Sequence, residues 1–152
     1  MPTQAFALRT LLPTTPETVF EHLSDPHNYL GLSPLIVEVR DVRRDGAEVR
    51  YTAVERFRFG FLRHDNVIEV SLVLGAGTID GAVRSPGGVR LRYGYRIEAA
   101  PAGTAVLDHI ALSTPRGLLG FAAGQARKAQ LGRSRELARR FPEPPPGNSP
   151  NR

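Results

Sequence analysis

Residues 14–34 read TTPETVFEHLSDPHNYLGLSP and contain two helix-start signals in succession. Thr15 is followed by Pro16, and Asp25 is followed by Pro26. In each pair a side chain that can cap a helix stands directly before a proline, the residue that best fits the first helical position. The segment therefore predicts two short helices, one directly after the other.

Strand patterns flank this helical segment on both sides. Before it, the apolar residues of Thr3–Leu12 predict one strand. After it, residues 35–113 are rich in Val, Ile, Tyr and Phe, and turn signals that contain glycine divide them into about six strands. One division has two solutions, because the long run 47–74 can turn either at Gly60 or at His64–Asn66. Together these runs predict an antiparallel sheet of about seven strands.

A helical period returns after Pro115 and continues to Phe141, which predicts the longest element of the chain. Small residues occupy the middle of its apolar face, whose members are Leu118, Leu119, Ala122, Ala126, Ala129, Leu137 and Phe141. Alanine at these positions either leaves space between helix and sheet or lets the two pack closely. The fold class is α+β, with a sheet, two short helices and a long C-terminal helix.

This order of elements resembles the SRPBCC, or START-like, superfamily. Locally, residues 14–34 are similar to the proline-started first helix and Asp-Pro turn of polyketide-cyclase-like members. Residues 103–112, GTAVLDHIAL, are similar to their last strand. The resemblance covers nearly the whole folded chain, and it implies a helix-grip fold in which the curved sheet and the long helix enclose an internal cavity. It specifies the fold better than the activity.

Length and composition set the domain organisation and the compartment. The 152 residues fit one domain, which we place at residues 1–141, and the proline-rich tail 142–152 is expected to be disordered. The absence of cysteine excludes thiolate catalysis and disulfides, and no run approaches the ~20 apolar residues of a membrane span. A cytoplasmic location is the resulting expectation.

The formal net charge of +5 is concentrated in the C-terminal helix. Residues 116–140 hold seven Arg or Lys residues against Glu136 alone, a balance of +6, so the rest of the chain sums to −1. Such a stripe is either a solvated helix face or a surface for nucleic acid, anionic lipid or an acidic partner. No nucleic-acid motif accompanies it, and we prefer the solvated face.

Strand alternation identifies the side chains that could line a cavity. Tyr93 and Tyr95 fall on the apolar side of their strand, and Asp108 shares a side with the apolar residues of the last strand. Glu55 falls in an apolar row together with Tyr51. With two residues of the terminal helix, the candidate ligand-binding set is Tyr51, Glu55, Tyr93, Tyr95, Asp108, Ala126 and Arg133.

Charged groups in this set require partners. Arg133 lies in the centre of an apolar helix face, and a buried carboxylate also needs a partner, so we expect Arg133 to pair with Asp108 or otherwise with Glu55. The alternative places Arg133 at the pocket rim and Glu55 at a strand end in water. His64 is a candidate acid or base only if the hairpin turns at Gly60, because it then faces inward.

Several kinds of site lack their sequence signals. No histidines show HxH or HExxH spacing with a third ligand, and GxGxxG, GxxxxGK[ST] and GxSxG motifs are all missing. We therefore expect no metal or other cofactor, and no nucleotide or serine-hydrolase chemistry.

Three functions remain. The resemblance implies a pocket for a hydrophobic or aromatic small molecule, either lipid or polyketide-like, and the protein is then a carrier or a polyketide cyclase/dehydrase. In the enzyme, Arg133 and a tyrosine would stabilise an enolate, while Asp108, Glu55 or His64 would move protons. The third is an interaction protein that uses the basic C-terminal helix on ribosome, RNA or membrane. The sequence carries no signal for the oligomeric state.

Overall fold

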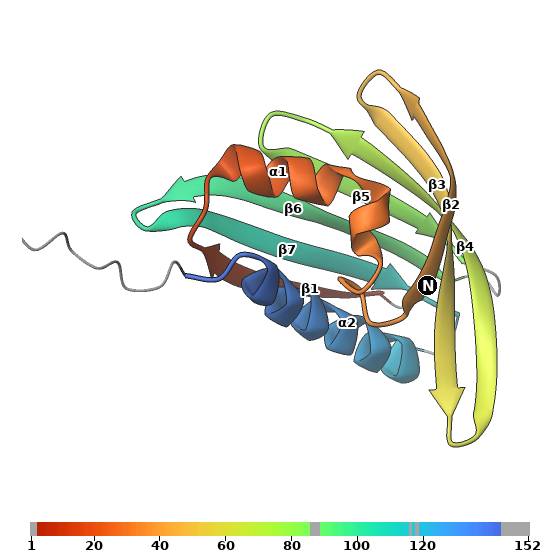
Figure 1. The fold of residues 1–152 in the computed structure, drawn as a ribbon. Helices are drawn as coiled ribbons and strands as arrows, with labels where there is room; N and C mark the ends of the chain where they lie inside the picture. The colour runs from red at the N-terminus through yellow and green to blue at the C-terminus, as the bar shows by residue number, and fades with distance from the viewer. Residues whose placement is uncertain (1–2, 86–88, 116, 118, 144–152) are drawn as a thin grey trace, which may run out of the picture.

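The computed structural model describes residues 3–85, 89–115, 117 and 119–143 (Figure 1). In chain order its elements are β1 (Thr3–Leu12), α1 (Pro16–Ser24), the 3-10 helix η1 (Pro26–Tyr29), β2 (Ile36–Asp45), β3 (Glu48–Phe59), β4 (Leu62–Leu74), β5 (Thr78–Arg84), β6 (Arg90–Ala100), β7 (Gly103–Ser113) and α2 (Leu119–Arg140). This is the predicted order. The tail beyond residue 143, the turn at 86–88 and Leu118 of the expected apolar face lie outside the described residues.

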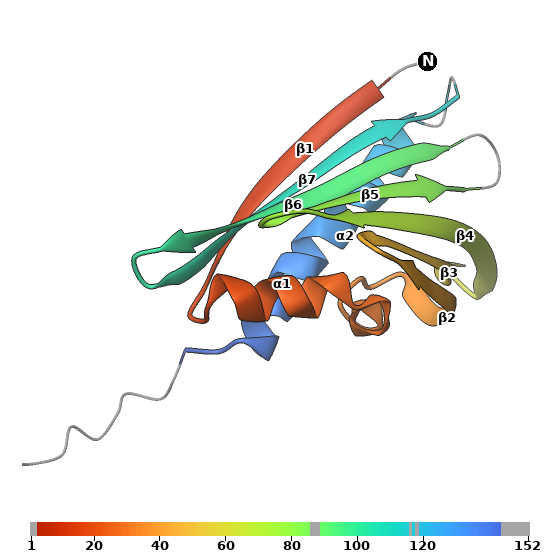
Figure 2. The same ribbon diagram turned by 90° about the horizontal axis from the view of Figure 1, so that it is seen from above.

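The seven strands form one antiparallel sheet in the order β1-β7-β6-β5-β4-β3-β2. Strands β2 to β7 pair with their neighbours in the chain, and β1 joins the sheet beside β7 over the full register Thr3↔Ser113 to Leu12↔Thr104. Figure 1 shows α1 and α2 on the same face of this sheet, and Figure 2 shows at right angles how the sheet curves around them. The predicted α+β architecture is confirmed.

Both cap-then-proline signals form the helix starts that they predict. The Thr15 hydroxyl accepts a hydrogen bond from the amide of Thr18 at 3.3 Å, which caps α1. The Asp25 carboxylate accepts one from the amide of His27 at 3.0 Å, which caps η1. Gly31 follows η1 with a positive φ of 78°, so the chain can leave the helix sharply.

The terminal helix begins at Leu119, four residues later than the predicted start at Pro115. Gly117 has a φ of 88°, and this left-handed backbone is incompatible with a helix that runs through it. Within α2, Gly132 allows a close approach, because a Cβ there would lie 3.0 Å from Pro34 Cγ. The loop before β2 therefore rests directly on the helix.

The hairpin between β3 and β4 turns at Gly60, which has a φ of 61°. Its register runs from Glu48↔Val73 to Phe59↔Leu62. The alternative turn at residues 64–66 is therefore wrong, and His64 is part of β4 with the same parity as the inward-facing Ile68.

The core lies between the concave face of the sheet and the two helices. Val19 and Leu23 of α1 are fully buried, and Leu137 of α2 is nearly so. Helix α1 packs on β5, β6 and β7, whereas α2 packs mainly on β1 and β7. The inner surface of β3 and β4 is therefore covered less closely than the rest of the sheet.

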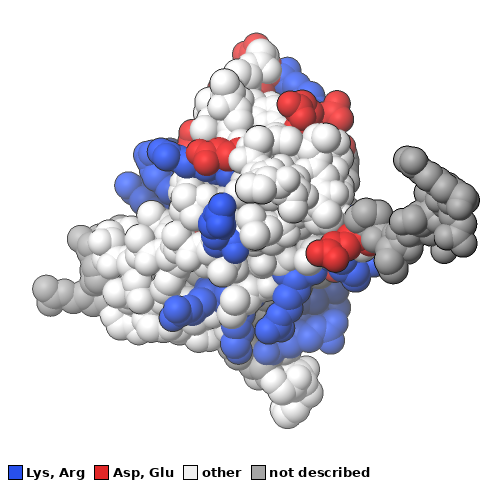
Figure 3. Space-filling model, turned by 90° about the vertical axis from the view of Figure 1, so that its left-hand side faces the viewer, with Lys and Arg blue, Asp and Glu red and all other residues white. Residues whose placement is uncertain are grey.

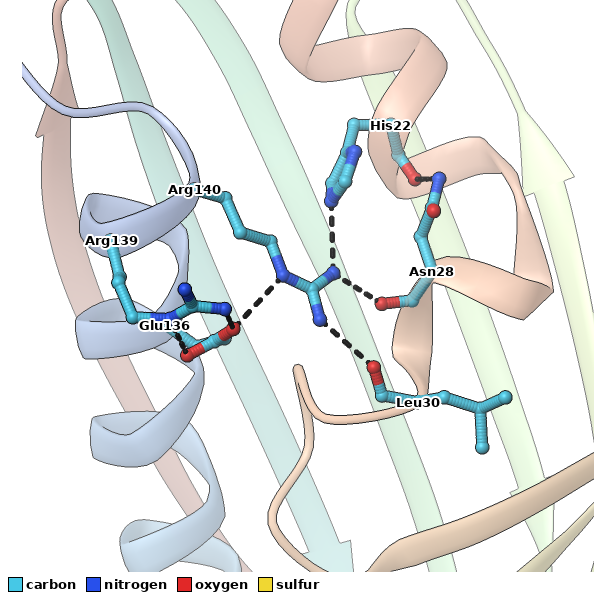
Figure 4. A network of polar contacts seen from close by, with 6 residues as sticks. All are labelled: His22, Asn28, Leu30, Glu136, Arg139 and Arg140. Atoms are coloured by element: carbon cyan, nitrogen blue, oxygen red, sulfur yellow. Dashed lines mark hydrogen bonds and ion pairs between the residues drawn. The ribbon is translucent and has the colours of Figure 1, made fainter.

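Arg140 attaches the C-terminal end of α2 to the two short helices (Figure 4). Its guanidinium donates hydrogen bonds to the backbone carbonyls of Asn28 at 2.6 Å and Leu30 at 2.8 Å. It also contacts His22 Nε2 at 3.0 Å and the Glu136 carboxylate at 3.1 Å. Burial and the neighbouring Arg140 lower the pKa of His22, so the neutral ring accepts this hydrogen bond.

The basic residues of α2 do not all belong to one solvated stripe. Figure 3 shows Lys and Arg gathered at the level of α2 on one face of the molecule. Yet the Arg127 guanidinium lies 5.5 Å from the centre of the Phe6 ring, and Arg133 is buried. Arg140 also donates hydrogen bonds to the backbone carbonyls of Asn28 and Leu30. Part of the positive charge therefore stabilises the packing of α2.

Candidate functional site

A cavity of about 440 Å³ lies between α2 and the inner face of the sheet, mainly over β3, β4 and β6. Its wall is predominantly apolar, and its volume falls within the range of small-molecule pockets. The cavity opens toward solvent where the exposed His64 and Phe121, which is 50% exposed, lie on its rim.

The alanines of α2 account for the position of the cavity. Ala122, Ala126 and Ala129 all line it, and each presents only a methyl group to the space beneath the helix. Near the end of the helix, where Leu137 replaces alanine on the apolar face, the side chain is 2% exposed and belongs to the packed core. Of the two interpretations of the alanine face, the structure supports the one that leaves space.

One end of the cavity is polar because Arg133 reaches it from α2. The expected pair with Asp108 is present: Arg133 Nε and Nη2 donate to the two carboxylate oxygens at 2.7 and 3.0 Å, and both side chains are almost fully buried. Gln130 completes the arrangement by donating to the Asp108 backbone carbonyl at 2.9 Å. Arg133 lines the cavity, whereas Asp108 lies behind it. The carboxylate thus holds the guanidinium in place.

The environment keeps Arg133 charged. Burial by itself lowers its pKa, but the neighbouring Tyr95 and Asp108, together with the hydrogen bonds to Asp108, raise the pKa above its ordinary value overall. A buried cation that already has a carboxylate partner is still a donor at the cavity wall. The hydrogen bonds to Asp108 use Nε and Nη2, which leaves Nη1 for a further acceptor.

Four tyrosines surround this polar end. The hydroxyls of Tyr51 and Tyr93 lie 3.4 Å apart at the cavity wall, and the ring of Tyr29 stacks on Tyr51 with 6.4 Å between centroids. The ring of Tyr95 lies 5.8 Å from the Arg133 guanidinium carbon, and its buried hydroxyl has no hydrogen-bond partner among the described residues. Burial raises the pKa of all four, so each phenol keeps its proton.

Glu55 is a carboxyl group in a different setting. It lines the cavity from β3, and the Asn66 amide donates to it at 3.4 Å. The same Asn66 amide nitrogen also donates to the Ser85 hydroxyl at 2.9 Å. Within the described part of the chain, no Arg, Lys or His forms an ion pair with Glu55. Burial raises its pKa above the ordinary glutamate value, and the weak contact with Asn66 only partly opposes this.

Most of the candidate set meets at this one cavity. The residues of the set that line it are Tyr51, Glu55, Tyr93, Ala126 and Arg133. Tyr95 and Asp108 are not in the lining and form a layer beneath Arg133. A ligand-binding role for the set remains a prediction.

Some residues of the site were not anticipated. Gln130 follows Ala126 by one helical turn and precedes Arg133 by three residues, so it shares their face, and that spacing is its signal. Asn66 has the parity of His64, and its inward position follows once the turn is at Gly60.

Across the described ranges, no group of three or more His, Asp or Glu side chains is placed to hold a metal ion. No helix in the described parts of the chain is long and apolar enough to cross a membrane.

Solved structures share this arrangement of sheet and helices. The Zhui aromatase/cyclase from Streptomyces sp. R1128 matches with a TM-score of 0.70 and 14% identity, over 93% of this chain and 97% of that chain. A START superfamily protein from Mycobacterium smegmatis matches with a TM-score of 0.59 and 15% identity, over 89% of this chain and 98% of that chain. This chain has a START-like helix-grip fold.

A third START-like match is the di-domain aromatase/cyclase BexL from the BE-7585A biosynthetic pathway. The TM-score is 0.71 at 16% identity, and the match covers 95% of this chain and 51% of that chain, about half of its length. By sequence, no family model and no curated protein matches the chain. At these identities the comparison establishes the START-like fold that the sequence resemblance implied.

Proposed function

We propose that this START-like protein binds a hydrophobic or aromatic small molecule, of lipid or polyketide-like character, in the cavity beneath α2. The observation that carries the proposal is a cavity of about 440 Å³ that is apolar over most of its wall and polar at one buried end. Ligand pockets of this kind bury an apolar body and orient it with a few polar groups.

The polar end would recognise an oxygen of the ligand. Arg133 is a fixed cation, and the hydroxyls of Tyr51 and Tyr93 retain their protons. All three can donate hydrogen bonds to a carbonyl, a hydroxyl or an enolate oxygen. The ligand is therefore expected to carry an oxygen at the end of its apolar body that enters the cavity first.

A second candidate function is acid and base catalysis in the same cavity, and Glu55 favours it. A carboxyl group whose pKa is raised in an apolar pocket is a stronger base than a solvated carboxylate and can accept and return a proton. Cyclisation and dehydration of a polyketone require removal of a proton from the carbon beside a carbonyl, then donation of a proton to the departing hydroxyl. Glu55 would move the proton, and Arg133 with Tyr51 or Tyr93 would stabilise the enolate oxygen.

Native mass spectrometry of the purified protein tests the binding proposal. We expect either a co-purifying small molecule or, with empty protein, one-to-one binding of the neutral fluorophore N-phenyl-1-naphthylamine, seen both as added mass and as a rise in fluorescence. Empty protein that takes up no fluorophore would contradict the proposal.

Proton exchange tests the catalytic candidate. With 2-acetonaphthone bound, the wild type should accelerate the exchange of its methyl protons with deuterated water, as followed by NMR. Glu55→Gln should remove this acceleration while the ketone still binds. Equal exchange with wild type and variant would exclude Glu55 as the base.

A further inference from the structure

A second groove, also of about 440 Å³, adjoins the cavity. The two share three wall residues and are therefore adjacent. These shared residues are Leu35, Phe57 and Gln125. The groove differs in chemistry, because the described residues of its remaining wall include three cationic residues and no carboxylate. The cations are Arg56, Arg58 and Lys128.

The groove exists because the end of β3 extends beyond the residue at which its antiparallel neighbour β2 begins. The first pair of the two strands is Ile36↔Glu55, and the amide of Arg56 donates to the Leu35 carbonyl at 2.8 Å. Beyond this point none of the described strands pairs with β3 on that side. Because amides two residues apart in a strand point the same way, the amide of Arg58 faces the groove. On the other side, Gln125 and Lys128, three residues apart on α2, form the wall.

The three cations are not equally available. Arg56 already forms two hydrogen bonds to the Asp65 carboxylate, at 2.9 and 3.1 Å. Arg58 and Lys128 are exposed, and neither forms an ion pair within the described ranges. Two exposed cationic residues in the wall of one groove, with no carboxylate among the described residues of that wall, create a positive potential there. An anion bound in the groove would be attracted by both charges, the guanidinium of Arg58 and the ammonium of Lys128.

We propose that this groove binds the anionic group, a carboxylate or a phosphate, of an amphiphilic ligand whose apolar body occupies the cavity. The inference rests on the proposed ligand-binding function and narrows its ligand class. The ligand would then have an anionic head at the mouth, held by Arg58 and Lys128, and a neutral oxygen at the buried end beside Arg133. A purely neutral hydrophobe would use only the cavity.

Displacement of N-phenyl-1-naphthylamine by three ten-carbon compounds tests this assignment. Decanol, decanoate and decyl phosphate share an apolar chain and differ in the head group. With wild type we expect both anions to bind about tenfold more tightly than decanol. We also expect about 0.5 M NaCl to reduce the advantage of the anions while decanol is unaffected, because salt screens exposed charges. The larger advantage identifies the preferred head group.

Substitutions in the groove test whether its cations cause the tighter binding of the anions. Arg58→Gln with Lys128→Gln should remove the advantage of the anions and leave decanol binding unchanged. Arg63→Gln is the matched control, because Arg63 lies on the same hairpin with a 57% exposed side chain but outside the groove, and it should retain the advantage. Arg58→Glu should make the anions bind more weakly than decanol. Thermal unfolding verifies that each variant is folded.

The outcomes separate the inference from the proposed function. If decanol binds but neither anion binds more tightly, or if the double variant keeps the preference, the anion site is wrong and the cavity proposal stands. If neither the fluorophore nor any of the three compounds binds, both proposals are wrong.

Discussion

Asp108 and Glu55 are two carboxylates on the concave side of one sheet, and their surroundings differ. Asp108 lies under α2 and has a two-point hydrogen bond to Arg133 plus contacts from Gln130. Glu55 lies on the part of the sheet that α2 covers less closely, and a single amide contacts it at 3.4 Å. The comparison indicates that a cation partner holds one carboxylate in place, whereas burial without a cation partner raises the pKa of the other carboxyl group.

The largest expected change in unfolding free energy comes from breaking the Arg133–Asp108 pair. Arg133→Ala leaves the Asp108 carboxylate buried without its cation, which typically costs ~3–5 kcal/mol of unfolding free energy. Urea denaturation at neutral pH measures it. The double variant Arg133→Met with Asp108→Leu should recover much of this loss, since an apolar pair of similar size leaves no stranded charge. An Arg133→Ala variant as stable as wild type would instead show that the pair serves only to orient ligand.

A smaller loss is expected where an arginine is partly buried. Arg140→Met removes the donors to the Asn28 and Leu30 carbonyls and the contact with His22, which should cost about 1–3 kcal/mol of unfolding free energy. Arg139→Met is the matched control, because the neighbouring Arg139 side chain is 73% exposed and bonds only to Glu136 among the described residues. Equal stability of the two variants would remove Arg140 as the attachment of α2 to the short helices.

Replacing Glu55, which has no cation partner among the described residues, should change the unfolding free energy less, and the change should depend on pH. The folded-state pKa of Glu55 is raised, so the folded protein binds this proton more tightly than the unfolded chain does. Wild type should therefore lose stability relative to Glu55→Gln as pH rises from the unfolded glutamate value of 4.5 through the folded pKa. Paired urea titrations across this range measure the difference. A constant difference would show that Glu55 is solvated.

Replacing Glu136 should have the smallest effect on stability. Its pH dependence should be opposite to that of Glu55, because the pKa of Glu136 is lowered rather than raised. Hydrogen bonds from Arg139, and then from Arg140, lower its pKa to about 2. The stabilisation from this partly buried carboxylate is present above the unfolded glutamate pKa and is lost as pH falls toward 2. Glu136→Gln should therefore approach wild-type stability at the acid end. A gap that widens on acidification would contradict this sign.

The sequence predicted the features that depend on local chemistry. The pairs Thr15-Pro16 and Asp25-Pro26 have the side chains and the fixed φ that begin helices, and both helices start there. The need of each buried charge for a partner predicts the pair of Arg133 with Asp108, which the structure contains. These inferences needed only parity, periodicity and the cost of an unpaired charge.

The remaining features depend on how distant segments meet. Strand parity put Tyr95 on the inward side but does not fix depth, and the residue lies beneath Arg133 rather than at the cavity wall. Gly60 and residues 64–66 both suit a turn, and only the full β3–β4 register decides between them. The cationic groove needs the late start of β2 at Ile36 and the position of α2 across from it, neither of which has a local signal.

Ligand binding in this protein requires the space beneath the alanines of α2, and filling that space tests the requirement directly. Ala126→Leu places a larger side chain inside the cavity, whereas Ala138→Leu makes the same change on the exposed side of the same helix. Titration of N-phenyl-1-naphthylamine into both folded variants should show at least about tenfold weaker binding by Ala126→Leu and wild-type binding by Ala138→Leu. Wild-type binding by Ala126→Leu would contradict the claim that this cavity is the ligand site.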